Sequence, residues 1–149
     1  MLSRQASHAL KALLELAARP LDWQSTHALA TAQQLPEPML EQLLLRLRRA
    51  GLLEARRGRV GGYRLSRPAR AISMELILAG LGEALTDSPH RLATSEPANS
   101  PADQVTNALH LRLERVRQKA LAELSLEDLL FDLRSAVAGS DGEGGVMLG

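Results

Sequence analysis

The sequence predicts a mainly α-helical fold that contains one two-stranded β-hairpin, and three observations lead to this prediction. Leucine and alanine recur at three- and four-residue spacing along several segments, as they do on the buried face of an α-helix. Only Trp23, Tyr63 and Phe131 are aromatic, so the core must be built from aliphatic side chains. Two short alternating stretches flank a glycine-rich turn at 57–62, which is typical of a hairpin.

The first two helices are each predicted from a serine cap. Ser3 is expected to begin a helix that ends before Arg19-Pro20. Its apolar face carries Ala6, Ala9, Leu10, Leu13, Leu16 and Ala17. Ser25 is expected to begin a short helix over Thr26–Gln33, with Leu29 and Ala30 facing inward. A tight turn at Gln34-Leu35-Pro36 separates it from the next helix.

A longer helix is predicted from Met39 to Ala50. Pro38 suits its first turn, where a missing N–H has no consequence, and Gly51 is expected to end it in a left-handed conformation. The predicted buried stripe consists of Met39, Leu40, Leu43, Leu44, Leu47 and Ala50. A short helix, a tight turn and a longer helix form the helix-turn-helix pattern.

The hairpin after Gly51 is predicted from a two-residue alternation. The residues expected to face the core are Leu53, Ala55, Tyr63 and Leu65, and those expected to face solvent are Glu54, Arg56 and Arg64. Tyr63 is expected to pack at the base of this hairpin rather than to bind a ligand. Helix-turn-helix and hairpin together predict a winged helix-turn-helix domain over 1–84.

The charge of the chain is divided between its two halves. Residues 1–70 carry 12 Lys/Arg and 5 Asp/Glu, a net of +7, and residues 71–149 carry 6 and 12, a net of −6. Nine arginines lie between Arg46 and Arg70, with Glu54 as the single acid among them. Such a cluster beside a bare glycine turn suits the phosphates of duplex DNA. The plainer alternative is a solvated surface whose charges cluster by accident.

A second long helix is predicted after the winged domain. Ser73 is expected to cap a short helix over Met74–Leu81, and 85–100 is expected to form a loop. Ser100-Pro101 then begins the long helix of a segment spanning 101–138. Its apolar stripe is predicted at Val105, Leu109, Leu113, Val116 and Ala120.

The long helix needs a surface that buries this stripe. A second copy of the chain is the simplest choice, because two-fold symmetry matches palindromic DNA. The alternative is that the helix packs back on its own domain. Ser125 is expected to cap a last helix that ends at Val137, followed by a disordered glycine-rich tail over 139–149.

The composition argues against several other classes of protein. No cysteine is present, which excludes disulfides, thiolate zinc sites and cysteine-ligated iron–sulfur clusters. No apolar run is long enough to span a membrane and no export signal is visible, so we expect a cytoplasmic protein. No nucleophile motif or paired-carboxylate site indicates an enzyme, and no cofactor is predicted. A metal or ligand site could form from His90, His110, Asp87 and Asp103, although solvated histidines are the plainer interpretation.

Two stretches of the sequence resemble the Rrf-type winged-helix regulators. The stretches are Leu40-Glu41-Gln42-Leu43-Leu44 with Leu47-Arg48-Arg49-Ala50-Gly51-Leu52, and the wing Arg57-Gly58…Gly61-Gly62-Tyr63-Arg64-Leu65. This family includes the iron–sulfur regulator IscR, the nitric-oxide sensor NsrR and the cysteine-metabolism repressor CymR. The resemblance extends from Leu2 to about Leu81. It implies a homodimeric repressor or activator in which the long helix is the dimer interface.

The resemblance also assigns DNA contacts by position. Glu41 and Gln42 correspond to the base-reading pair, and Arg57 with its neighbours to the wing contacts in the minor groove. The full set of expected DNA-binding residues is Arg4, Thr26, Pro38, Met39, Glu41, Gln42, Arg46, Arg49, Arg56, Arg57, Gly58, Arg59 and Gly61.

The chain departs from the family pattern in three places. Cluster-binding members carry cysteines in the loop corresponding to Thr86–Ser100, and this chain has none. Basic residues that are common near the start of the first helix are replaced by Gln5 and Ser7, and the residues about the helix turn are Gln34, Pro36 and Pro38 instead of a more usual glycine and serine. Sensing through a cysteine-ligated cluster therefore does not transfer, and the preferred DNA site is expected to differ.

A protein-interaction module is the second class of function that fits these features. Winged helices that dimerise can recruit proteins through the wing and the long helix, with little affinity for DNA, and an unknown small-molecule or protein effector fits either class. Salt dependence separates the two: phosphate contacts weaken binding with a log–log slope of about −0.9 per phosphate, whereas a protein partner gives a shallower dependence.

Overall fold

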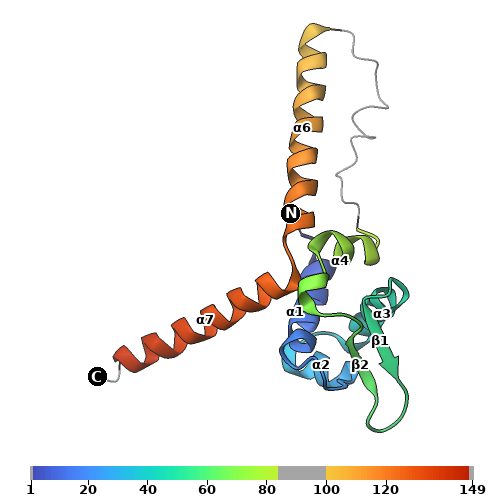
Figure 1. Cartoon of the computed structure of the whole chain (residues 1–149), viewed down its shortest axis with the longest axis vertical. Coiled ribbons are helices and arrows are strands. Elements are labelled where there is room, and N and C mark those ends of the chain that lie inside the picture. The colour runs from blue at the N-terminus through green and yellow to red at the C-terminus, as the bar shows by residue number, and fades with distance from the viewer. Residues whose placement is uncertain (1, 84–99, 148–149) are drawn as a thin grey trace.

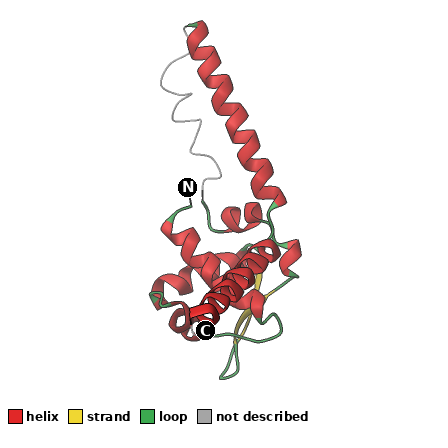
Figure 2. Ribbon diagram, turned by 90° about the vertical axis from the view of Figure 1, so that its left-hand side faces the viewer, coloured by secondary structure: helices red, strands yellow, loops and turns green. Residues whose placement is uncertain are grey.

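A computed structural model of the chain describes residues 2–83 and 100–147. The elements in chain order are α1 (Arg4–Ala18), α2 (Thr26–Gln33), α3 (Glu37–Arg49), β1 (Leu53–Arg56), β2 (Gly62–Leu65), the 3-10 turn η1 (Ala69–Ala71), α4 (Met74–Gly80), α6 (Pro101–Glu123) and α7 (Leu126–Met147). Helices α1 to α4 form the body, the hairpin projects from one end of it, and α6 extends from the opposite end (Figures 1 and 2). The mainly helical winged architecture predicted from sequence is confirmed. The predicted loop over 85–100 lies outside the described residues, except for Ser100.

Serine side chains begin the helices where the sequence predicts them. The hydroxyl of Ser3 accepts a hydrogen bond from the N–H of Ala6 at 3.0 Å, and that of Ser25 from Ala28 at 3.0 Å. Ser73, Ser100 and Ser125 cap their helices in the same way. Each cap satisfies a backbone donor that has no partner within the helix, which stabilises a helix by about 1 kcal/mol.

Left-handed residues end the two helices of the helix-turn-helix. Gly51 has φ +81°, and the N–H of Leu52 donates to the carbonyl of Leu47 at 3.0 Å. This closure is the Schellman motif that the sequence predicted for Gly51. Gln34 ends α2 in the same conformation, with φ 54°. A glutamine there carries backbone strain of about 1–2 kcal/mol that a glycine would avoid.

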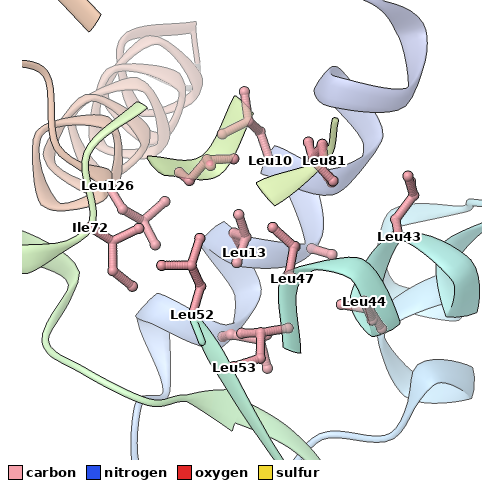
Figure 3. Close-up of a cluster of buried hydrophobic side chains, with 14 of the residues drawn as sticks. Leu10, Leu13, Leu43, Leu44, Leu47, Leu52, Leu53, Ile72, Leu81 and Leu126 are labelled. Atoms are coloured by element: carbon pink, nitrogen blue, oxygen red, sulfur yellow. The ribbon is translucent and has the colours of Figure 1, made fainter. Parts of the chain in front are cut away.

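The core consists of aliphatic side chains from every element of the body (Figure 3). Its fully buried large members are Leu13, Leu16, Leu29, Leu40, Leu43, Leu44, Leu47, Leu52, Ile72, Ile77 and Leu126. No polar or charged residue is buried in the described part of the chain. Burial of each leucine contributes about 1.5–3 kcal/mol, so apolar packing is the main interaction that holds the helices together.

Three predicted core positions differ in the structure. Helix α3 begins at Glu37 rather than Met39, and Met39 is only half-buried. Ala50 is exposed because the chain turns there from α3 into Gly51. Ala55 is exposed because the hairpin has by then left the body (Figure 1).

The predicted hairpin is present, and it has one further partner. Leu53 pairs with Leu65, and Glu54 with Arg64. The outer edge of β2 also pairs with Gln24. The N–H of Gln24 donates to the carbonyl of Tyr63 at 3.0 Å, and the N–H of Tyr63 donates to the carbonyl of Gln24 at 2.8 Å. Gly62 makes this approach possible, since a Cβ there would lie 2.4 Å from the carbonyl carbon of Gln24. The wing is thereby docked on the connection between α1 and α2.

The C-terminal half of the chain returns to the body at the start of α7. The N–H of Met74 donates to the carbonyl of Leu124 at 2.8 Å, and the N–H of Leu126 donates to that of Ile72 at 2.8 Å. Leu126 and Leu130 are buried in the core. The core of the winged domain therefore includes residues beyond the predicted boundary at 84.

A capping box begins α7. The carboxylate of Asp128 accepts hydrogen bonds from the backbone N–H of Ser125 at 2.9 Å and from its hydroxyl at 3.0 Å. These bonds favour the ionised form and lower the pKa of Asp128. The contribution of the Asp128 carboxylate to this cap is thus complete above the ordinary pKa of a carboxyl group and is lost as the pH falls through the lowered pKa, whereas the Ser125 hydroxyl continues to accept from the N–H of Asp128.

Helix α7 is longer than the sequence predicted. The expected end was Val137, followed by a disordered tail over 139–149, but the backbone is helical to Met147. No proline follows Pro101 to stop the helix. Glycine is about 1 kcal/mol less favourable in a helix than alanine, but it keeps the backbone donor that proline lacks, so it does not by itself end the hydrogen-bond ladder.

We predict that Gly62→Ala destabilises the protein by about 1–3 kcal/mol, because the new Cβ would meet the backbone of Gln24 at a residue whose φ is +143°. Urea unfolding followed by circular dichroism measures the change.

Gly58→Ala is the matched control for this variant. Its φ is +110°, but a Cβ there would meet nothing within 4 Å. It therefore isolates backbone strain from steric contact. Equal destabilisation by the two variants would show that the approach of Gln24 is not what requires glycine at position 62.

Candidate nucleic-acid interface

Helix α3 turns one face to the core and the opposite face to solvent. Leu40, Leu43, Leu44 and Leu47 are buried. Pro38, Glu41, Gln42 and Arg49, which share the other face at helical spacing, are exposed. We call these four residues the reading face. Its amide, carboxylate and guanidinium groups are the kinds that recognise adenine, cytosine and guanine edges.

The turn before α3 is held by contacts from α1 and α2. His27 of α2 lies 3.0 Å (Nδ1) from the carboxylate of Glu37. His8 of α1 lies 3.5 Å (Nδ1) from the sulfur of Met39, so Met39 is partly engaged in packing. Arg4 is exposed one turn before His8 on the same face of α1, which places it on the side of α1 that meets the start of α3. Thr26, the first residue of α2, is half-buried.

Three of the nine clustered arginines donate hydrogen bonds within the chain. Arg46 donates to the carbonyl of Leu81 at the end of α4, at 3.4 Å, although the sequence placed it among the DNA contacts. Arg64 donates to Glu54 at 2.5 Å, and Arg67 lies 3.5 Å from the carbonyl of Gly51. The remaining members of the cluster are exposed: Arg48, Arg49, Arg56, Arg57, Arg59 and Arg70.

The tip of the wing combines exposed arginines with bare backbone. We call residues 57–61 the wing tip. Arg57 and Arg59 are exposed, and the N–H of Gly61 closes the turn on the carbonyl of Gly58 at 3.0 Å. A Cβ at Gly61 would lie 2.1 Å from the carbonyl oxygen of Arg56, so only glycine fits there. A narrow tip that carries guanidinium groups can approach a sugar–phosphate chain closely.

Trp23 is a member of this region that sequence reasoning missed. It lies in the connection between α1 and α2, for which the sequence predicts only a short link. The guanidinium carbon of Arg64 is 4.2 Å from the centre of its ring, and that of Arg56 is 5.8 Å away. The sequence shows that a single tryptophan precedes the cap of α2, but nothing in the local pattern says which arginines it meets.

The predicted stripe of α6 is exposed in the single chain. Val105, Leu109, Leu113 and Val116 are 69%, 52%, 57% and 64% exposed, and Ala120 is exposed as well. Helix α6 contacts the body near its C-terminal end, where Leu121 packs against the core, and the rest extends away from it (Figures 1 and 2). The alternative in which α6 packs back on its own domain is therefore not what the structure shows.

Other kinds of site have little support. Within 2–83 and 100–147, no group of three or more histidine, aspartate and glutamate side chains could hold a metal ion. Of the residues considered for a metal site, His90 and Asp87 lie outside the described residues, and His110 and Asp103 lie two turns apart on α6. No helix in the described ranges is long and apolar enough to cross a membrane.

The arrangement agrees with the known proteins that the chain is similar to. Residues 2–132 match the Rrf2 family, described as iron-dependent transcriptional regulators. The HTH-type transcriptional regulator slr0846 of Synechocystis sp. is 39% identical, over 96% of this chain and 95% of its own. IscR of Cereibacter sphaeroides is 34% identical, over 87% of this chain and 86% of its own.

Solved structures show the same fold. CymR, the global cysteine regulator of B. subtilis, superposes with a TM-score of 0.73 at 29% identity, covering 87% of this chain and 95% of its own. IscR of T. potens superposes with a TM-score of 0.67 at 30% identity, covering 91% of this chain and 90% of its own. These relatives are regulators of transcription and not enzymes. The chain belongs to the Rrf2 family of winged helix-turn-helix, DNA-binding transcriptional regulators.

Proposed function

We propose that the chain is a sequence-specific regulator that binds a palindromic site in double-stranded DNA as a homodimer, without a cysteine-ligated iron–sulfur cluster. The observation that carries the proposal is the pairing of two exposed surfaces: the reading face of α3 and the arginine-bearing wing tip that immediately follows it in the chain. The reading face suits base edges in the major groove, and the wing tip suits the adjacent phosphates. The absence of cysteine from the sequence supports the last clause.

The geometry of α6 supports the homodimer. Its 23 residues give a helix about 35 Å long. Two copies packed antiparallel along the exposed stripe would hold their bodies about that distance apart. Successive major grooves on one side of B-DNA are about 34–36 Å apart, which suits two half-sites related by a two-fold axis.

The direct experiment is the selection of binding sites from random duplexes with the full chain, followed by a salt titration on the enriched sequence. We expect an inverted repeat whose half-sites are about one helical turn apart. Enrichment of no sequence, together with binding that barely depends on salt, would favour the protein-interaction module.

Arg57→Ala is expected to weaken binding to all duplexes and to flatten the log–log salt slope by about 0.9 per site, because one phosphate contact is lost. Fluorescence anisotropy of labelled DNA over a range of salt concentrations measures both quantities. Arg134→Ala, which removes an exposed arginine from α7, is the control and should change neither. If Arg57→Ala also changed neither, the wing tip would not contact phosphate.

Gln42→Ala is expected to relax preference at one base position by about 1–3 kcal/mol, because a side-chain amide can form paired hydrogen bonds with adenine. Affinities for every single-base variant of the enriched site measure this change. Gln118→Ala, at an exposed position of α6 away from the stripe, is the matched control. A uniform loss across all variants would place Gln42 on the backbone rather than on a base.

Leu113→Arg is expected to convert the dimer into a monomer and to abolish the preference for an inverted repeat, because it places a charge within the apolar stripe. Light scattering after size-exclusion chromatography measures the mass.

Leu111→Arg is the matched control for the dimer. Leu111 lies on the opposite side of α6 and is 51% exposed, compared with 57% for Leu113. The control variant should remain a dimer. A dimeric Leu113→Arg protein, or two variants that behave alike, would show that the stripe is not the interface.

A further inference from the structure

Trp23 is held beside the wing by backbone contacts of the two residues that follow it. Its neighbour Gln24 pairs with Tyr63 of β2 through two hydrogen bonds of 2.8 and 3.0 Å. Gly62 leaves room for the backbone of Gln24 and Ser25, since a Cβ there would lie 2.4 and 2.7 Å from their atoms. The backbone that carries the half-buried Trp23 side chain is therefore fixed by the wing itself.

Two arginines of the hairpin lie over this ring. Arg64 is 4.2 Å and Arg56 is 5.8 Å from the ring centre, both within the range of about 6 Å at which a guanidinium group is attracted to an indole face. The two arginines differ in their other contacts. Arg64 is half-buried and paired with Glu54, so its charge is already matched. Arg56 is exposed and directly precedes the wing tip.

We infer that Trp23 is a positioning residue for DNA binding: it holds the guanidinium group of Arg56 in place for a backbone phosphate beside the wing tip, while Arg64, paired with Glu54, stacks on the same ring. An arginine free in solvent samples many rotamers and loses that freedom on binding. The tryptophan restricts Arg56 beforehand, so less conformational entropy is lost when the phosphate is bound. This inference rests on the proposed placement of the wing on DNA.

The arrangement also separates two roles among neighbouring arginines. Arg56 and Arg64 lie on the same face of the hairpin, on adjacent strands. Because Arg64 is paired with Glu54 and stacked on Trp23, its role is to stabilise the folded wing. Arg56 has the ring as its neighbour and its charge remains available to DNA.

A double-mutant cycle between Trp23 and Arg56 tests this inference. Anisotropy is measured on a random-sequence duplex at low salt for the wild-type protein, Trp23→Leu, Arg56→Ala and the double variant. Leucine keeps an apolar side chain at position 23 and removes the aromatic face. We expect Trp23→Leu to weaken binding by about three- to tenfold, which corresponds to the ordering of one arginine side chain. In the Arg56→Ala background the same change should have little further effect.

Trp23→Phe separates positioning from packing. A phenyl ring retains a face for the guanidinium group, so this variant should recover most of the affinity that Trp23→Leu loses. Thermal unfolding of each variant, with binding measured well below the melting temperature, shows that the protein is folded. A role limited to stability would lower the melting temperature and leave the coupling between Trp23 and Arg56 at zero.

The outcomes distinguish this inference from the proposed function. A wild-type protein that ignores duplex DNA at low salt would overturn the proposed function. A wild-type protein that binds, with Trp23→Leu weakening binding equally in both backgrounds or not at all, would overturn only the positioning role of Trp23.

Discussion

Strand β2 has a backbone partner on each of its edges, and the wing depends on this constraint. A two-stranded hairpin alone is marginally stable in water. Here β1 pairs with one edge of β2, and Gln24 pairs with the other through Tyr63. Gly62 is the condition for that approach, because any side chain there would occupy the space of the Gln24 backbone. Helix α3, which carries the reading face, and the wing are thus parts of one rigid unit. The segment that docks the wing, the connection between α1 and α2, precedes both of them in the sequence.

A second docking point joins the winged unit to the long helix. The pairing of Ser73 with Ser125, and the burial of Leu126 and Leu130, fix the end of α6 and the start of α7 on the body. A long helix attached through a flexible linker would leave the distance between two wings undetermined. The buried attachment instead gives the body a definite orientation relative to the α6 stripe, as the proposed homodimer requires if it is to bind two half-sites at one spacing.

Sequence reasoning succeeded where the signal is local. Spacing within a few residues predicts the serine caps, the glycine that ends α3, the leucine stripe from Leu40 to Leu47 and the β-hairpin, and the structure confirms them. It failed where the partner is distant in sequence. Trp23, the docking of Gln24 and the burial of Leu126 depend on contacts across tens of residues, for which no periodicity exists. The predicted end of α7 at Val137 is wrong, because the glycines that follow lower helix propensity without removing a backbone donor as proline would. The DNA contacts and the dimer stripe stay predictions, although the exposure of Glu41, Gln42, Arg57 and the α6 stripe agrees with them.

The contacts that dock the wing have a consequence for how the protein responds to its ionic surroundings. Amide pairing at Tyr63 and close backbone approach at Gly62 involve no net charge, and an arginine stacked on an indole retains apolar contact when dissolved ions weaken its electrostatic attraction. Counterions therefore compete for the tip of the hairpin without loosening its base. The protein can therefore release a polyanion at high salt while the wing stays folded, so rebinding requires no refolding.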